Sequence, residues 1–267
     1  MLPVIARELK DRKWSIFAYS VGSLLLLWIY VATFESSQAS SQQLQELLKS
    51  YPKAFLDALG MGDLTLSNLE TYLNAKHFSL MWPIIAIILA LSRAGGQIAG
   101  EISSGTMGLL LSLPLDRIKI FLAKYLVGLI TILIFTSVSV FGVIPLAAAY
   151  DIPTDVGILT MTWVLTSLFM LMVYSFGLAI SSIVSEAYKV YAITAAILFF
   201  SYAAYIVALI DTKFEWLKNI SVFHYFNTQK VLTTGDIDTS TWLVFGGVIL
   251  VCSVFAGWRF NKRDISV

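Results

Sequence analysis

The chain of 267 residues is rich in apolar side chains and poor in charge. It is 58% hydrophobic and 13% charged, with a mean hydropathy of +0.79. A soluble domain is about half apolar and about a quarter charged, so this composition excludes an ordinary soluble protein and indicates an integral membrane protein. The net charge of +1 adds little, because orientation in a membrane depends on where basic residues lie.

Six apolar runs are each close to the ~20 helical residues that are needed to cross a bilayer. They cover residues 15–34, 78–96, 125–150, 157–184, 190–210 and 241–258. Residues 1–14 place apolar side chains on one helical face among basic ones, which predicts an amphipathic helix that leads into the first run. We expect Arg93, at the end of the second run, to extend toward the membrane surface. The sequence therefore predicts one all-α membrane domain, residues 1–267, with six spans.

Two connections, residues 35–77 and 211–240, are too long for simple turns. A helical period of apolar residues predicts a helix near residues 44–55, and Ser67 with Glu70 matches a capping box before a second short helix. The aromatic run in 211–240 predicts one or two short helices at the membrane interface, and Gly235 then marks a turn.

The basic residues predict the orientation. If both termini lie in the cytoplasm, six of the 18 basic residues fall on the outer connections, namely Lys49, Lys53, Lys76, Lys213, Lys218 and Lys230. The other twelve fall on the inner side, although the outer connections are longer. The positive-inside rule favours this orientation, so we expect a multi-pass protein of the cell membrane with both termini in the cytoplasm.

The most informative stretch, QIAGEISSGTMGLLLSLPLDRIKIFLAK (residues 97–124), lies between the second and third runs. Ile98, Ile102 and Leu109 have the spacing of one helical face, and Pro114 removes a backbone donor and ends a helix. The stretch predicts a short helix at the membrane surface. From residue types alone an ordinary cytoplasmic loop, with glycines for turning and basic residues for topology, is the more common interpretation.

The order of residues in this stretch resembles the type-2 permeases of ATP-binding-cassette (ABC) transporters. That class has a glycine-glutamate pair, a glycine-threonine pair, a leucine-rich run, a proline and a basic residue in this order. Here these are Gly100-Glu101, Gly105-Thr106, residues 109–113, Pro114 and Arg117, with Lys124 as a further basic match. The six spans, the basic start and the closing Phe260 and Arg263-Asp264 are also similar. The long connection 35–77 departs from many members.

The resemblance implies a function for the 97–113 segment. It would be the cytoplasmic coupling helix that contacts a separate ABC ATPase, in an exporter that works as a homodimer or heterodimer of permease subunits. The implied contact residues are Gly100, Glu101, Ser103, Ser104, Gly105, Thr106, Pro114 and Arg117. ATP and Mg²⁺ would belong to the partner ATPase, and we expect no cofactor in this chain, no metal site and no nucleic-acid partner. Substrate-binding residues stay unassigned.

The chemistry that the sequence lacks agrees with a permease subunit. No G-x-x-x-x-G-K-[ST] loop is present, so a separate subunit would have to bind the nucleotide phosphates. The predicted spans hold almost no ionisable residues at mid-depth, which disfavours ion-coupled transport and favours a hydrophobic or amphipathic cargo. His77 and His224 pair with no carboxylate in an obvious motif, so a membrane enzyme is a remote alternative. A scaffold or sensor that recruits an ATPase stays a closer one.

Hydroxyl groups in the spans have two interpretations. They could line a cleft for cargo, or they could bond to their own helix and to neighbouring helices, which is the more common arrangement. The set comprises Thr131, Thr136, Ser137, Ser139, Thr162, Thr166 and Ser175.

Overall fold

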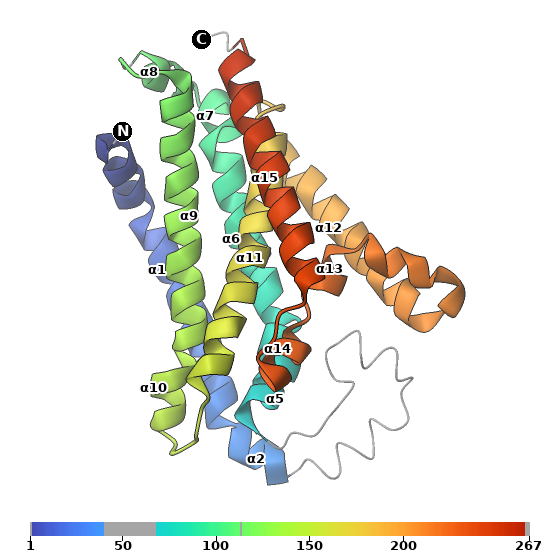
Figure 1. Cartoon of the computed structure of the whole chain (residues 1–267). Coiled ribbons are helices and arrows are strands. Elements are labelled where there is room, and N and C mark those ends of the chain that lie inside the picture. Colours follow the sequence, from blue (N-terminus) through green and yellow to red (C-terminus); the bar gives the residue numbers. More distant parts are fainter. Residues whose placement is uncertain (1, 40–67, 113, 265–267) are drawn as a thin grey trace.

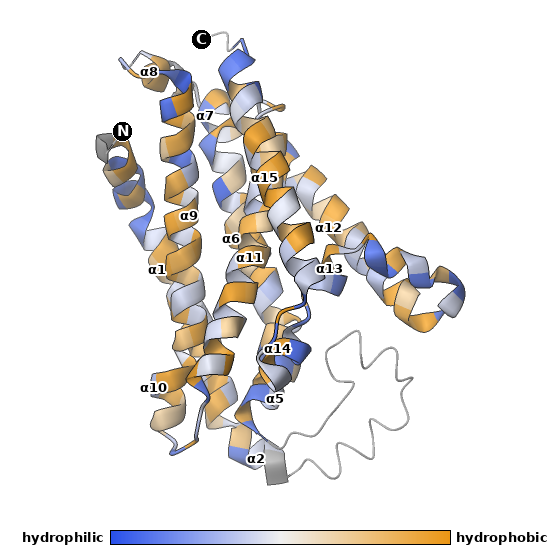
Figure 2. Cartoon of the chain, in the orientation of Figure 1, coloured by the Kyte–Doolittle hydropathy of each residue, from blue (hydrophilic) through white to orange (hydrophobic). Residues whose placement is uncertain are grey.

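A computed structural model describes residues 2–39, 68–112 and 114–264. All regular elements within these ranges are helices, and the long ones pack side by side as a bundle (Figure 1). The first and last described residues lie at the same end of this bundle, which we call the terminal end. Orange apolar residues dominate the middle of the long helices, and blue polar residues gather toward the ends (Figure 2). The predicted all-α class is thus confirmed for the described residues, and the apolar middles of the helices agree with a membrane protein.

Within the described residues, five helices are long and apolar enough to cross a membrane. These are α1 (Leu2–Ala32), α9 (Arg117–Phe141) continued by α10 (Val143–Ala148), α11 (Val156–Ser181), α12 (Ala187–Ile210) and α15 (Thr239–Lys262). A sixth segment is broken: α5 (Leu69–Leu73) and a π-helical turn (Asn74–Phe78) meet α6 (Met81–Gln97) at a bend of 49°. Six spans therefore result only if this bent pair counts as one, and the count of six stays a prediction.

Of two helix starts, one follows its prediction and the other differs. α1 runs without a break from the amphipathic start into the first span. α9 begins at Arg117 rather than near residue 125, and Asp116 occupies its N-cap position. Apolarity marks only the part of a helix that lies in hydrocarbon, so polar turns that extend a span are missed by hydropathy.

Short helices occupy the described parts of the long connections. After α2 (Phe34–Ala39), the structure places the N-cap of α5 at Asn68, whose side chain accepts a hydrogen bond from the Thr71 amide at 3.0 Å. The predicted cap at Ser67 and the predicted helix near residues 44–55 lie outside the described residues. In the second connection, a 3₁₀ helix (Thr212–Asn219), α13 (Val222–Tyr225) and α14 (Thr228–Thr234) confirm the prediction of short helices. Gly235, with φ of 73°, ends α14.

α11 lies inside the bundle and packs against α6, α9 and α15. α12, in contrast, leans away from the bundle (Figure 1) and buries few side chains: Val190, Thr194, Leu198 and Ala208. Most of its other apolar residues are exposed. This helix therefore offers a long apolar face to lipid or to another subunit.

Aromatic rings fill the core at the end opposite the termini. Trp82 is fully buried, and its ring stacks with Phe135 and Phe226 at centroid distances of 6.1 and 6.0 Å. The Trp82 indole N–H donates to the Ser139 hydroxyl at 2.9 Å. The indole thereby keeps its polar group satisfied inside an apolar layer that joins α6, α9 and the second connection.

Arg93 does not extend toward the surface as predicted. Its side chain is only 3% exposed and lies between α1 and α6. Because the charged group faces into the bundle, polar partners must compensate it there.

Candidate functional site

The 97–113 segment folds as two short helices rather than the single helix predicted. α7 (Ala99–Ser103) and α8 (Met107–Leu111) are separated by a turn. Gly105 has φ of 73° in this turn, a conformation that glycine adopts without the steric cost of a Cβ. Residues 103–106 are exposed at the terminal end of the bundle (Figure 1). We call these four residues the tip of the segment.

The predicted apolar face of this segment is wrong in its last member. Ile98 is 1% exposed, as expected for a core residue, but Leu109 is 73% exposed. The turn at Gly105 interrupts the helical period, so residues on either side of it do not share a face. Leu109 therefore presents an apolar side chain at the surface next to the tip.

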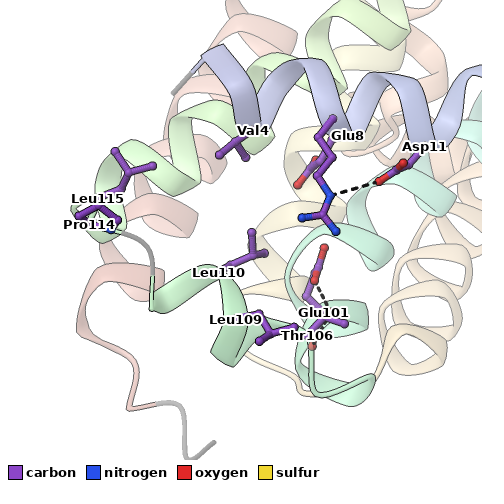
Figure 3. A pocket seen from close by; sticks show the side chains of 10 residues that line it. Val4, Glu8, Asp11, Glu101, Thr106, Leu109, Leu110, Pro114 and Leu115 are labelled. Carbon is purple, nitrogen blue, oxygen red and sulfur yellow. Dashed lines mark hydrogen bonds and ion pairs between the residues drawn. The ribbon is translucent and has the colours of Figure 1, made fainter.

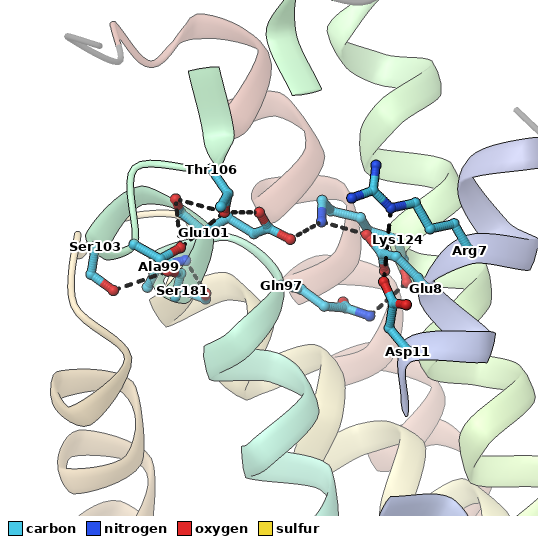
Figure 4. Close-up of polar contacts among 12 residues, drawn as sticks. Arg7, Glu8, Asp11, Gln97, Ala99, Glu101, Ser103, Thr106, Lys124 and Ser181 are labelled. Carbon is cyan, nitrogen blue, oxygen red and sulfur yellow. Dashed lines mark hydrogen bonds and ion pairs between the residues drawn. The ribbon is translucent and has the colours of Figure 1, made fainter. Parts of the chain in front are cut away.

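Glu101 joins a buried cluster of charges (Figure 4). The Lys124 ammonium, on α9, lies 3.2 Å from Oε1 of Glu101 and 2.6 Å from Oε1 of Glu8 on α1. The Lys124 side chain is 1% exposed, whereas the carboxylate side chains of Glu8 and Glu101 retain 19% and 22% exposure. Two carboxylates offset the cost of taking one ammonium out of water. One lysine thus connects α1, the 97–113 segment and α9.

The second carboxylate oxygen of Glu101 accepts a hydrogen bond from the Thr106 hydroxyl in the tip. Thr106 also contacts the Ser104 hydroxyl at 2.9 Å. Glu101 therefore bridges two environments, since one of its oxygens contacts the tip and the other contacts the buried lysine. A displacement of the tip would move this carboxylate relative to Lys124.

A second group of hydrogen bonds fixes the start of the segment. The Gln97 amide donates to the Lys124 carbonyl at 2.7 Å, and the Tyr174 hydroxyl of α11 donates to Gln97 Oε1 at 2.5 Å. The Ala99 amide donates to the Ser181 hydroxyl at 3.0 Å (Figure 4). These contacts attach the base of the segment to α9 and α11.

Arg117 does not belong to this cluster. Its guanidinium donates to the Arg263 carbonyl at 2.5 Å. The Arg263 guanidinium donates in turn to the carbonyls of Ser182 and Val184 at 3.0 and 2.8 Å, and to the Ser185 hydroxyl at 2.7 Å. Burial, and then the neighbouring charge of Arg259, lowers the pKa of Arg263. An arginine stays charged at neutral pH, so it binds the free carbonyls at the C-terminal end of α11.

A cavity of about 620 Å³ opens between the start of α1 and the 97–113 segment (Figure 3). One wall is charged, with Arg7, Glu8 and Asp11 on α1. The other wall is largely apolar and includes Leu109, Leu110, Pro114 and Leu115. Glu101 and Thr106 also line it, so the cavity borders the cluster around Lys124.

The hydroxyl groups of the spans follow the second of the two interpretations. Thr131, Thr162 and Thr166 donate to carbonyls of their own helices at 2.8–2.9 Å. The others contact neighbouring side chains: Thr136 with Ser167, Ser137 with Trp163, Ser139 with Trp82, and Ser175 with Tyr125 and Ser253. These hydroxyls stabilise helix packing, and none of these contacts assigns them to a cargo site.

Comparison with protein families shows which family has a sequence of this kind. The model of the ABC-2 family transporter protein matches residues 2–265, which is nearly the whole chain. The chain belongs to the ABC-2 transporter family. A search of curated proteins finds no match to this ABC-2 chain. Membership makes the chain the membrane component of a transporter, rather than a catalytic domain.

The predicted site residues of this ABC-2 protein lie in several different environments. Ser103, Ser104, Gly105 and Thr106 form the exposed tip, Glu101 joins Lys124 and Glu8, and Pro114 lines the cavity. Gly100 packs closely, since a Cβ there would lie 3.1 Å from the Gly95 carbonyl oxygen. Arg117 contacts Arg263 instead. Sequence reasoning missed Glu8, whose signal was an acidic residue within a basic amphipathic helix.

Proposed function

We propose that this chain is the membrane subunit of an ATP-driven exporter, and that a cytoplasmic ABC ATPase binds the tip of the 97–113 segment. Family membership supports the permease assignment, and the sequence has no phosphate-binding loop of its own. The single observation that carries the proposal is the contact of Lys124 with both Glu101 and Glu8. It gives the tip a direct connection to two long helices.

The connection suggests how nucleotide binding would move the helices. Closure of an ATPase dimer would displace the tip. Glu101 would transmit this displacement through Lys124 to α9 and α1, while the Ala99–Ser181 hydrogen bond would transmit it to α11. Because packed helices move as rigid bodies between discrete arrangements, a small shift at the tip can switch the bundle between inward-facing and outward-facing states.

The functional unit we propose is a dimer of permease subunits with two ATPase copies. The exposed apolar residues of α12 support a second subunit or lipid at that face. The cargo we propose is hydrophobic or amphipathic. In support, the clustered charges Glu8, Glu101 and Lys124 lie at the terminal end rather than at mid-depth, so an ion-coupling site within the bilayer lacks its usual carboxylates among the described residues.

The test is co-purification with a candidate ATPase, followed by its ATP hydrolysis rate. Ser104→Arg in the tip makes a clash with a bound partner without touching Lys124, so it should abolish co-purification. Glu101→Gln should leave the ATPase bound, but the rate of ATP hydrolysis should no longer respond to the permease. Asp236→Arg, in the second connection at the opposite end of the bundle, is the control and should behave as wild type.

Two outcomes would overturn the proposal. If the ATPase fails to bind the wild-type chain, or if it binds Ser104→Arg equally well, the tip is not its contact. A scaffold or sensor function that uses the connections at the opposite end would then be the better hypothesis.

A further inference from the structure

The seam between α1 and α6 borders two cavities, which lie at different levels of the bundle and share no lining residue. The helices run antiparallel, with Arg12 close to Gly96 at the terminal end and Leu26 close to Ile85 deeper in the bundle. An apolar groove of about 320 Å³, lined by Gly22, Leu26 and Ile85 among others, is widely open to the outside. A smaller cavity of about 190 Å³ next to Arg12 and Arg93 is mostly polar.

Within the described part of the chain, two of the three guanidinium nitrogens of Arg93 lack hydrogen-bond partners in this polar cavity. Its Nε and Nη2 atoms are buried and have no hydrogen-bond partner among the described residues. Buried N–H groups of a guanidinium that lack partners are costly, so a ligand or water must compensate them. Arg12 lines the same cavity, and its Nη2 lies 3.0 Å from the point that a Cβ would occupy at Gly96.

The acidic residues around this cavity are already paired. Glu8 and Glu101 bind Lys124, and Asp11 lies 3.8 Å from Arg7. Two guanidinium groups are therefore left facing one polar cavity. Guanidinium groups bind phosphate through two parallel hydrogen bonds, which makes a phosphate the best-matched occupant.

The groove favours an occupant that also carries an apolar chain. Arg12 and Leu26 are separated along α1 by about 21 Å at a rise of ~1.5 Å per residue. One leaflet contributes about half of the ~30 Å hydrocarbon core, so a headgroup with its acyl chain fits this length. A Cβ added at Gly22 would meet no atom within 4 Å. No side chain of the protein therefore fills the groove beside Gly22.

We infer that the α1–α6 seam binds a membrane phospholipid, with its phosphate between Arg93 and Arg12 and one acyl chain in the groove beside Gly22. The lipid site requires only that the chain spans a membrane, so its test is independent of the proposed ATPase contact. A lipid in this position would lie against the start of α1, which also carries Glu8.

The test measures thermal unfolding of the full-length protein in detergent, with phosphatidylglycerol added. This lipid should raise the unfolding temperature in the wild type. Diacylglycerol with the same acyl chains, and inorganic phosphate alone, should each raise it far less. Arg93→Gln and Arg12→Gln should weaken the apparent lipid affinity about tenfold each, the loss expected for a charge-assisted hydrogen bond. Lys13→Gln removes an exposed charge from the same helix and should keep the full shift.

A groove variant keeps the test decisive if Arg93→Gln does not fold. Gly22→Leu places a side chain in the open groove and favours the helix, so the protein should fold while its lipid-dependent shift falls. An equal shift in all variants would overturn the inference, because the lipid would then act only as bulk solvent. A full shift with inorganic phosphate or with diacylglycerol would also overturn it, as would a change of oligomeric state in Gly22→Leu, which would assign the groove to a second subunit.

Discussion

Lys124 and Glu8 are 116 positions apart in the sequence, yet the lysine ammonium lies 2.6 Å from the glutamate carboxylate. Their contact brings the start of α1 against α9 at the level of the 97–113 segment. Glu101 completes the group at 3.2 Å. The three charges connect α1, the 97–113 segment and α9, and no local sequence pattern predicts this contact.

Replacing Lys124 with Met should destabilise the fold strongly. The variant keeps the side-chain volume but leaves two partly buried carboxylates without their cation, at a cost of about 3–5 kcal/mol. Thermal unfolding in detergent measures the change. Adding Glu8→Gln and Glu101→Gln to this variant should restore most of the loss. Lys119→Met, on an exposed ion pair of the same helix, is the control and should change little.

Gly128 should tolerate no side chain. A Cβ at this position would overlap the phenol of Tyr174, which is fully buried and cannot move aside. Gly128→Ala should cost about 1–3 kcal/mol of stability through overpacking. Gly246→Ala, where nothing lies within 4 Å, should instead stabilise α15 by about 0.5–1 kcal/mol. Equal effects of the two changes on the unfolding temperature would contradict this account.

Arg263→Gln should loosen the turn between α11 and α12. The variant loses charge-assisted hydrogen bonds to Ser182, Val184 and Ser185, worth about 1–3 kcal/mol together. Hydrogen exchange at residues 183–185 should accelerate. Lys262→Gln removes the same charge from the neighbouring exposed position and should leave the exchange unchanged, unless the turn is stabilised by charge alone.

His224 should make stability fall as the solution becomes acidic. Burial of the ring and the nearby Lys218 charge lower the pKa of His224, against a smaller raising effect of Asp238. Below an ordinary pKa of about 6.5, the unfolded chain therefore takes up a proton that the folded chain resists, so the free energy of unfolding decreases. The pH is lowered from about 8 to about 5, across the ordinary titration range of histidine. Over this range the unfolding temperature should fall less in His224→Gln than in the wild type. Parallel curves would contradict the assignment.

The sequence predicted the long helices because each span must be apolar over most of its length. It located the short helices after α12 because their aromatic residues suit the membrane interface. It did not predict the bend before α6, since Pro83 lies in the first turn of that helix, where proline is tolerated.

The charged contacts were harder to predict for a different reason. Lys124 and Arg93 both fall near span ends, where basic residues usually serve orientation. Their inward positions depend on which helices pack together, and hydropathy carries no information about pairing. The turn at Gly105 was visible as a glycine next to serines, but the resulting exposure of Leu109 required the three-dimensional path of the chain.

Trp82 gives this protein an internal optical reporter. Its indole is stacked with Phe135 and Phe226 and donates to Ser139, whereas most of the other tryptophans are exposed, namely Trp14, Trp28, Trp216, Trp242 and Trp258. Indole emission depends on polarity, so separation of α6 from α9 at this end would shift the fluorescence of Trp82 toward longer wavelengths. A chain in which all the other tryptophans are replaced by phenylalanine would therefore display rearrangement of the aromatic layer without any attached dye.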